Sequence, residues 1–309
     1  MAVVAFHKGK FVPLEQATIG IMTHAFHYGT AVFEGVRGNW NADQGRMYIF
    51  RLREHYERLL AGCKILRIKL PYTAGDLCDV TVEMVERSGF TQDIYIRPIA
   101  YKSEERVAYL NLGGLSDDFT VMAVPFGRYI DTEAPAKCCT SSWRRMEDTV
   151  IPPHVKISGL YVNGILAKTE AMAAGFDEAI LLNDKGYVSE GSGENLFMYR
   201  NGQLATPPLV DNVLPGITRS CVFDIAKNEL GMDVVERHIP RSELYLADEV
   251  FLTGTAAHLT AVGSLDNQVI GDGTMGALTH KLQDLYFDIV RGKNNKYLHW
   301  CTPAIPKVG

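Results

Sequence analysis

The order in which strands and helices follow one another is the feature of this sequence that most constrains its fold. In the first half of the chain, only two helices interrupt a series of short apolar strands, predicted at residues 3–6, 11–12, 47–50, 94–101 and 119–126. A doubly wound parallel sheet would instead require a helix after nearly every strand. Because the strands cluster, their order predicts an α+β fold with mixed layers.

Apolar residues at helical spacing predict where the helices lie. Helices are expected at residues 52–66, 73–89, 160–174, 217–230 and 274–291. The second has the clearest end signals, because Thr73 and Asp76 have the spacing of a capping box and Gly89 is typical of a helix C-terminus. Between the later helices, turn sequences at 184–186 and 201–202 predict β-hairpins.

The length of 309 residues exceeds the usual size of one domain, so two domains or one large domain are both compatible with it. The segment 127–137 carries polar residues and a proline without periodicity, which is typical of a loop between domains. The prediction is therefore a small N-terminal α/β domain at 1–126, an interdomain loop at 127–137 and a larger C-terminal domain at 138–309.

Composition and charge argue against several classes of function. Hydrophobic residues make up 47% of the chain and charged residues 22%, which is ordinary for a globular protein. A formal net charge of −5 argues against binding of nucleic acid or of an anionic membrane surface, so the expected ligands are small molecules. No apolar stretch has the length of a membrane span or of a signal h-region, and a cytoplasmic location is expected.

No metal site is predicted. The six cysteines have no paired metal-ligand spacing and no C-x-x-C motif, so they are expected to be free thiols in a reducing compartment. Adjacent Cys138 and Cys139 would point to opposite faces of a strand, which disfavours joint ligation. His24 and His27 lack a convincing third ligand and are interpreted as structural residues.

Three residues in the centre of the chain have the side chains that pyridoxal phosphate (PLP) chemistry requires. Lys156 offers an amine for a Schiff base, Glu190 a carboxylate for the pyridine nitrogen, and Tyr161 a phenol beside the ring hydroxyl. Each residue by itself is commonplace, because most lysines and glutamates are solvated and a glutamate before glycine usually marks a turn. Their combination makes a PLP site a hypothesis.

Two short segments are candidates for binding a phosphate group. Residues 216–218 (Gly-Ile-Thr) open a predicted helix, and the N-terminus of a helix presents unpaired N–H groups to an anion. Residues 254–257 (Gly-Thr-Ala-Ala) follow an apolar strand, where a tight turn could direct backbone amides at an anion. Both are also ordinary capping sequences. The glycine pattern of a dinucleotide-binding loop is absent after Glu190.

Tyr95 and Arg97 are predicted to lie side by side on one face of a strand. Ile94 and Ile96 alternate with them and point to the other face, which leaves the phenol and the guanidinium about 7 Å apart along the strand. Such a pair suits a carboxylate, whereas the alternative is an arginine on a solvated sheet face. Both interpretations remain open from these residues alone.

Seven segments of the sequence together resemble the class IV (fold-type IV) PLP transaminases, and most closely the branched-chain amino acid aminotransferases. They lie at residues 24–35 (HAFHYGTAVFEG), 53–59 (REHYERL), 95–98 (YIRP), 189–197 (SEGSGENLF), 214–219 (LPGITR), 246–251 (LADEVF) and 254–257 (GTAA). Because these matches are collinear over nearly the whole chain, the similarity is highly specific. It implies a two-domain α+β fold like that of D-amino acid aminotransferase, with PLP at the domain interface and the larger C-terminal domain as the PLP-binding one.

The resemblance also implies which residues contact the cofactor and the substrate. The implied cofactor contacts are Arg58, Lys156, Tyr161, Glu190, Leu214, Gly216, Ile217, Thr218 and Thr255, with Arg58, Ile217, Thr218 and Thr255 on the phosphate. The implied substrate contacts are Tyr95, Arg97, Thr255, Ala256 and Ala257 for the α-carboxylate, and Tyr28, Phe33, Phe126 and Tyr129 for the side chain. Without the resemblance, the helical wheel would make Arg58 a solvated charge.

The implied reaction is transfer of the amino group from leucine, isoleucine or valine to 2-oxoglutarate, in a homodimer or a higher homo-oligomer. Lys156 would be both the covalent anchor and the general base. Residues 102–109 depart from the family, which usually has a short glycine-rich loop there that reaches the neighbouring subunit, and Phe126 replaces a common tryptophan. The alternatives are therefore an (R)-amine or D-amino acid transaminase, an aminodeoxychorismate-lyase-like enzyme, or a branched-chain enzyme with secondary (R)-amine activity. The presence of Lys156, Tyr161 and Glu190 disfavours a non-catalytic protein that binds a phosphate ligand.

Overall fold

The computed structural model describes residues 3–127 and 134–306 and divides the chain into two compact units. The first unit consists of Met1–Gly127, Val155–Gly159 and Asp288–Gly309, and the second of Arg128–His154 and Leu160–Phe287. The domain boundaries at residues 126 and 138 remain a prediction, and these units divide the chain differently. The segment that carries Lys156 and the C-terminal residues belong to the first unit, whereas the sequence placed both in the larger domain.

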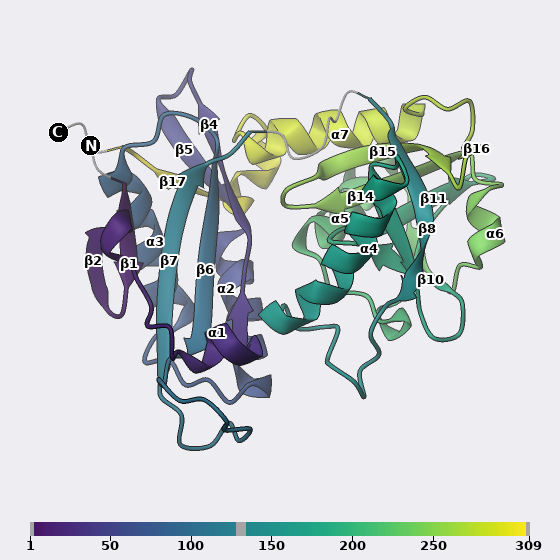
Figure 1. The fold of residues 1–309 in the computed structure, drawn as a ribbon. Helices are drawn as coiled ribbons and strands as arrows, with labels where there is room; N and C mark the ends of the chain where they lie inside the picture. The colour runs from purple at the N-terminus through teal and green to yellow at the C-terminus, as the bar shows by residue number, and fades with distance from the viewer. Residues whose placement is uncertain (1–2, 128–133, 307–309) are drawn as a thin grey trace. The chain divides into compact units, whose positions relative to one another are not determined.

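The first unit contains an eight-stranded sheet (Figure 1) in the order β17-β5-β4-β6-β7-β1-β2, with β3 paired to β6. Its strands are β1 (Val4–His7), β2 (Lys10–Pro13), β3 (Ala31–Phe33), β4 (Val36–Asn41), β5 (Arg46–Phe50), β6 (Ile94–Lys102), β7 (Asp117–Pro125) and β17 (Cys301–Ala304). Its helices are α1 (His24–Tyr28), α2 (Leu52–Ile65) and α3 (Ala74–Ser88), with 3-10 helices η1 (Leu14–Gln16) and η4 (Asn295–Trp300). Lys8 and Gly9 have φ values of 49° and 79° in the turn that joins β1 and β2 into an antiparallel hairpin.

Helices α2 and α3 pack on one face of this sheet because each carries an apolar stripe. Fully buried side chains of the helices and of the strands form the core, among them Ile49, Leu59, Leu77 and Ile96. The predicted capping box is present, because the Thr73 hydroxyl accepts the Asp76 N–H and the Asp76 carboxylate accepts the Thr73 N–H. Gly89 ends α3 in the left-handed conformation, as its position predicted.

The second unit contains a nine-stranded sheet in the order β10-β9-β8-β15-β14-β11-β12-β13, with β16 paired to β15. Its strands are β8 (Ala136–Arg144), β9 (Glu178–Leu182), β10 (Val188–Gly191), β11 (Asn195–Arg200), β12 (Gln203–Thr206), β13 (Val234–Glu236), β14 (Glu249–Gly254), β15 (His258–Leu265) and β16 (Gln268–Val269). Its helices are α4 (Tyr161–Ala173), α5 (Ile217–Leu230), α6 (Arg241–Leu244) and η3 (Leu209–Asp211). Helices α7 (Ala277–Val290) and η2 (Ser158–Leu160) each include residues of both units. Strand β8 pairs in parallel with β9 and β15, whereas β14 pairs antiparallel with β11 and β15. This mixture confirms the predicted α+β class.

Alternation along the strands of the second unit builds two separate apolar layers. Ala179 and Leu181 of β9 face helix α4, whereas Ile180 enters the core on the other side. Cys138 lies in that core, and its neighbour Cys139 packs against the α4 layer. The two thiols therefore point to opposite faces of β8, as predicted.

The structure differs from the sequence prediction at a few elements. The five predicted helices are present, but α7 begins at Ala277 because Asp272 caps a turn through the N–H of Thr274 at 2.9 Å. Helix α1 was not predicted, since five residues are too short to show a period. The predicted loop 127–137 overlaps β8, because Ala136 already pairs with β15.

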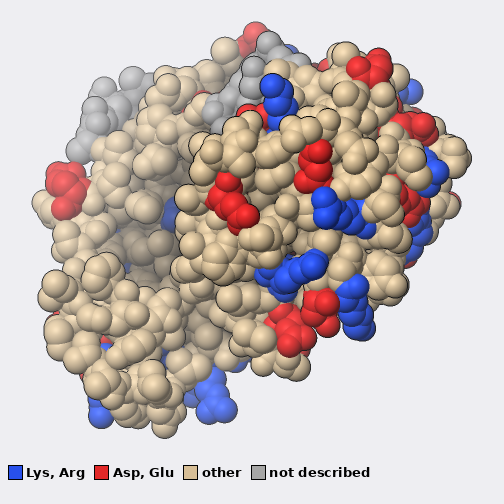
Figure 2. Space-filling model, turned by 45° about the vertical axis from the view of Figure 1, so that its right-hand side comes forward, with Lys and Arg blue, Asp and Glu red and all other residues tan. Residues whose placement is uncertain are grey.

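Acidic and basic side chains are interspersed on the face of the molecule shown in Figure 2. That face therefore offers no extended positive patch to a polyanion, in agreement with the formal charge of −5. Within the described residues, none of the helices combines the length and the apolar character needed to cross a membrane.

Candidate active site

Lys156 lies in the short segment Val155–Gly159, which is attached to strand β3 of the first unit. The Phe33 N–H donates to the Lys156 carbonyl at 3.1 Å, and Val32 and Ile157 form an antiparallel bridge. The lysine is half-buried, and its Nζ lies 5.5 Å from the centroid of the Phe33 ring. Backbone pairing to β3 therefore determines where the amine emerges, with an aromatic surface beside it.

A buried carboxylate orients Arg58, the residue that the resemblance assigns to the phosphate. Glu34 is fully buried and accepts two bonds from the Arg58 guanidinium at 2.7 Å and one from His55 Nδ1 at 2.8 Å. Burial by itself raises the pKa of Glu34, but the Arg58 charge and the bonds from His55 and Arg58 outweigh it and hold that pKa well below its usual range. Burial also lowers the pKa of His55. The forked contact holds the guanidinium in one orientation.

Tyr95 and Arg97 lie together on β6, as their spacing predicted. The Arg97 guanidinium donates to the Tyr95 hydroxyl at 2.8 Å, and its Cζ lies 4.4 Å from the centroid of the Phe33 ring. The ring of Phe126 lies 5.1 Å from that of Tyr95. A Cβ at Gly35 would collide with the Tyr95 hydroxyl, so the absence of a side chain there makes room for the phenol. One guanidinium, one phenol and two further aromatic rings make a surface suited to a carboxylate with an apolar side chain.

Tyr28 is bonded to the segment that departs from the family. Its hydroxyl accepts the Ala108 N–H at 2.8 Å, and its ring centroid lies 4.6 Å from that of His24. His24 Nε2 donates to the Tyr109 carbonyl at 2.8 Å, and His27 bonds to another backbone carbonyl. Both histidines thus have partners within the fold. Within residues 3–127 and 134–306, no group of three or more His, Cys, Asp or Glu is arranged to hold a metal ion.

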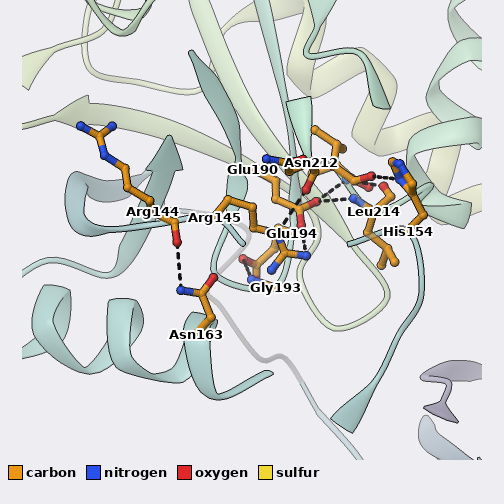
Figure 3. A network of polar contacts seen from close by, with 11 residues as sticks. Arg144, Arg145, His154, Asn163, Glu190, Gly193, Glu194, Asn212 and Leu214 are labelled. Carbon is orange, nitrogen blue, oxygen red and sulfur yellow. Dashed lines mark hydrogen bonds and ion pairs between the residues drawn. The ribbon is translucent and has the colours of Figure 1, made fainter. Parts of the chain in front are cut away.

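Glu190 is the centre of a polar network in the second unit (Figure 3). At the end of β10, its carboxylate accepts the Asn195 side-chain amide at 2.9 Å and the Leu214 N–H at 3.0 Å. The Arg145 guanidinium pairs with the other carboxylate oxygen at 2.7 Å, and its Nε donates to the Asn212 carbonyl at 3.2 Å. Glu190 is only 5% exposed. Three donors, one of them charged, therefore converge on one buried carboxylate.

Helix α5 begins without a side-chain cap. Gly216 is its N-cap, and the first helical hydrogen bond runs from the Ser220 N–H to the Gly216 carbonyl. A Cβ at Gly216 would collide with the amide oxygen of Asn195, so glycine is required at this close approach. The N–H groups of Ile217 and Thr218 lie in the first turn, where an α-helix supplies no carbonyl partner. This arrangement suits an anion such as a phosphate.

Tyr161 and the turn at residues 255–257 are the remaining predicted contacts in the second unit. Tyr161 is half-buried and is the first residue of α4. The turn joins β14 to β15, and the Thr260 hydroxyl donates to the Ala257 carbonyl at 2.8 Å. Ala257 is buried, whereas Thr255 and Ala256 are half-buried. Two adjacent positions of this turn therefore stay accessible.

The predicted site residues divide between the two units. The first unit holds Tyr28, Phe33, Arg58, Tyr95, Arg97, Phe126 and Lys156. The second holds Tyr161, Glu190, Leu214, Gly216, Ile217, Thr218, Thr255, Ala256 and Ala257. Tyr129 lies outside the described residues. Sequence reasoning missed Glu34, His55 and Arg145, because no local pattern marks a side chain whose partner is distant in the chain.

Comparison with known proteins identifies one family. A family model described as amino-transferase class IV matches residues 31–265. The chain is 49% identical to a probable branched-chain-amino-acid aminotransferase of Aquifex aeolicus over 303 residues, covering 98% of this chain and 97% of that protein. The crystal structure of a branched-chain aminotransferase from Thermoproteus uzoniensis with norvaline is similar with a TM-score of 0.93 and 43% identity, covering 98% of this chain and 99% of that one. The PLP form of the enzyme from Thermobaculum terrenum has a TM-score of 0.93 and 35% identity, with 98% of each chain covered.

These matches extend over nearly the whole chain, as the seven collinear segments do. The resemblance and the two-sheet α+β fold are both confirmed by them. The chain belongs to the class IV aminotransferases.

Proposed function

We propose that this chain is an aminotransferase that moves the amino group of leucine, isoleucine or valine to 2-oxoglutarate, with PLP as its cofactor. The observation that carries the proposal is the buried Glu190 carboxylate, on which Arg145 and two N–H donors converge. Relatives that match over nearly the full length are named branched-chain aminotransferases, and one is described in its PLP form.

The residues of the chain suit each part of PLP. The Glu190 carboxylate would accept a bond from the protonated pyridine nitrogen. The N–H groups of Ile217 and Thr218, together with the Arg58 guanidinium, would bind the phosphate, and the Tyr161 phenol the ring oxygen. When bound, PLP supplies an electron sink for the electrons that remain on Cα as its proton leaves. We propose Leu214, Gly216 and Thr255 as further cofactor contacts.

Lys156 would have two tasks in this reaction. It would hold the cofactor covalently through Nζ when no substrate is bound. As a free amine, Lys156 Nζ would be the general base that accepts the proton from Cα of the amino acid and the acid that returns a proton later in the reaction. Because the amino acid and the oxo acid would use the same site one after the other, we expect ping-pong kinetics.

The aromatic face of β6 supports recognition of an amino acid. Tyr95 and Arg97 would bind the α-carboxylate, with the backbone amides of residues 255–257. The rings of Phe33 and Phe126 would contact an apolar side chain. Tyr28, Tyr129, Ala256 and Ala257 complete the proposed substrate contacts.

A panel of amino donors tests the proposed function. The purified holoprotein is mixed with 2-oxoglutarate and with L-leucine, L-isoleucine, L-valine, D-leucine or (R)-1-phenylethylamine, and glutamate is quantified. We expect the three branched L-amino acids to be the best donors. Preferred use of the D-amino acid or of the amine would favour the alternative that residues 102–109 leave open.

Replacing Arg97 by alanine should separate carboxylate recognition from support of the fold. A charged hydrogen bond is worth roughly 1.5–3 kcal/mol, so kcat/KM for L-leucine and L-glutamate should fall by about 10- to 150-fold. For (R)-1-phenylethylamine, which has no carboxylate, kcat/KM should stay the same or rise in this variant, because the change removes a charge from an aromatic surface.

The matched control is Arg87→Ala, which removes an exposed arginine that pairs with Glu83 on α3. This variant should keep kcat/KM for every donor within about twofold of wild type, since exposed ion pairs contribute little to stability. Equal losses for L-leucine and the amine in Arg97→Ala would show that Arg97 supports the fold and does not bind the carboxylate.

We also propose that the protein is a homodimer that pairs through helix α4. This helix leaves four apolar side chains exposed, namely Val162 (54%), Ile165 (59%), Leu166 (39%) and Met172 (63%). Their spacing places them along one side of the helix. If two copies paired through this side of α4, the four apolar side chains of each copy would be buried against those of the other, since a two-fold interface is self-complementary.

Replacing Ile165 by glutamate should convert the dimer to a monomer at micromolar concentration, because a charge would have to be buried in the apolar interface. Sedimentation velocity measures this change. Val269→Glu, which alters an exposed apolar residue of β16, should remain dimeric. A wild-type protein that sediments as a monomer would contradict the proposal.

We propose a cytoplasmic location for this activity. None of the six cysteines forms a disulfide in the structure. Unpaired cysteines are typical of proteins in a reducing compartment.

A further inference from the structure

Two buried glutamates of the second unit contact each other, and the mechanism above uses neither. Glu178 is the first residue of β9 and is fully buried, and Glu194 is 6% exposed. Their carboxylates accept the N–H groups of two adjacent residues, Ser192 and Gly193, and the charge of Glu178 acts on Glu194. Lys168 of α4 is a cation beside them, and its Nζ donates to Glu178 Oε2 and to the Asp177 carbonyl, each at 2.6 Å.

The same two glutamates hold the turn that follows strand β10. The Gly193 N–H donates to Glu194 Oε2 at 3.1 Å (Figure 3), and the Ser192 N–H donates to Glu178 Oε1 at 3.4 Å. The Gly191 N–H donates to the Glu194 carbonyl oxygen at 2.7 Å. Three consecutive N–H groups of the turn therefore end on Glu178 or Glu194.

This turn separates Glu190 from one of its partners. Glu190 directly precedes the turn, and Asn195, whose amide donates to the Glu190 carboxylate, directly follows Glu194. Helix α4 is in close contact with the turn, because a Cβ at Gly164 would collide with the Ser192 carbonyl. A displacement of the turn would therefore disturb the hydrogen bonds of Glu190. It would also disturb the contact between the turn and helix α4.

The charges around the pair favour one proton between the two carboxyl groups. Two ionised carboxylates in contact repel each other, whereas a shared proton makes the contact a hydrogen bond. Burial is the main cause that raises the pKa of Glu194 to about 8, and the Glu178 charge adds to it while Lys168 opposes it. Cys138 is paired with Glu178 across β8 and β9, and burial together with the charges of Glu178, Glu194 and Asp177 raises the pKa of its thiol. That thiol is therefore neutral at pH 7.

We infer that Glu178 and Glu194 share one proton, hold the turn at residues 191–193 and thereby position the carboxylate of Glu190. The inference rests on the proposed function only for the task of Glu190 at the pyridine nitrogen. Because both glutamates act through Glu190, they are positioning residues.

Release of PLP from the holoprotein after dilution tests the positioning. Glu194→Ala removes the pair and should release PLP about tenfold faster at pH 7, since a bond to a charged group is lost. Glu194→Gln keeps the shape and donates an N–H to Glu178, so release should stay within about twofold of wild type. Glu170→Gln, an exposed glutamate of α4 bonded to Ser142, is the control and should not differ.

The pH dependence of release separates a shared proton from a merely structural role. Wild-type release should accelerate between pH 7 and 9 with a midpoint near pH 8, where Glu194 loses its proton. Glu194→Gln cannot ionise, so this step should be missing from its profile.

The stability of the cofactor-free protein tests the shared proton without reference to PLP. The pKa of Glu194 is raised in the folded state, so its contribution to stability is complete below about pH 4.5 and is lost as the pH rises to about 8. The ratio of the unfolding constant of wild type to that of Glu194→Gln, both measured in urea, should therefore rise at least about tenfold from pH 5 to 8. Above that pH the ratio should stay level.

Parallel stability profiles for wild type and Glu194→Gln would overturn the shared proton. The positioning role would be overturned if Glu194→Ala released PLP at the same rate as wild type. It would also be overturned if Glu194→Gln and Glu194→Ala released PLP faster than wild type by the same factor. If Glu194→Ala does not fold, the comparison of Glu194→Gln with wild type still tests the inference, through the pH dependence of PLP release and of unfolding. A wild-type protein that fails to bind PLP would instead refute the proposed function, while the urea profiles would still test the pair.

Discussion

Replacing Lys156 by alanine is expected to slow amino transfer from L-leucine by about four orders of magnitude. The change removes both the covalent anchor and the general base, and a general base alone contributes roughly 10²- to 10⁴-fold. Single-turnover mixing of L-leucine with PLP-saturated protein measures the loss. In wild type, borohydride reduction followed by peptide mapping should find the pyridoxyl group on the peptide that contains Lys156.

The matched control is Lys185→Ala, which removes an exposed lysine in the turn before Tyr187. It should retain wild-type turnover and the reduced peptide. The assignment of Lys156 is wrong if the Lys156→Ala protein keeps a borohydride-reducible cofactor and full activity.

Replacing Glu190 by glutamine should leave PLP bound but slow removal of the Cα proton by roughly 10²- to 10³-fold. The neutral amide cannot keep the pyridine nitrogen protonated, so the ring withdraws electrons less strongly. The change also places a neutral partner opposite the buried Arg145, which should lower the free energy of unfolding by about 1–3 kcal/mol. Single-turnover kinetics and urea unfolding measure the two effects separately.

A double variant, Glu190→Gln with Arg145→Gln, distinguishes chemistry from stability. Removing the unpaired charge should restore part of the lost stability, whereas the rate of proton removal should stay low. Proton removal at nearly the wild-type rate in Glu190→Gln would reject the role of this carboxylate.

Local signals predicted the parts of the structure that depend on neighbours in the sequence. The capping box of Thr73 and Asp76 and the left-handed Gly89 define α3, because each acts within one turn of the helix. Tyr95 and Arg97 meet on β6 because strand alternation alone places them on one face.

Contacts between residues distant in the sequence could not be predicted in this way. The partnership of Glu34 with Arg58 requires the loop after β3 to meet helix α2, and periodicity does not report which elements meet. Arg145 reaches Glu190 because β8 and β10 both pair with β9, which is a property of strand order. The family resemblance assigned roles to Arg58 and Glu190, but not to Glu34 or Arg145.

The transfer of nitrogen from a branched-chain amino acid to 2-oxoglutarate is the central claim, and isotope labelling tests it most directly. The purified holoprotein is incubated with [15N]L-leucine and unlabelled 2-oxoglutarate, and mass spectrometry follows the label. The account predicts [15N]L-glutamate and 4-methyl-2-oxopentanoate in equal amounts, with no net consumption of PLP. Absence of labelled glutamate from a PLP-loaded protein that does accept nitrogen from (R)-1-phenylethylamine or D-leucine would contradict it.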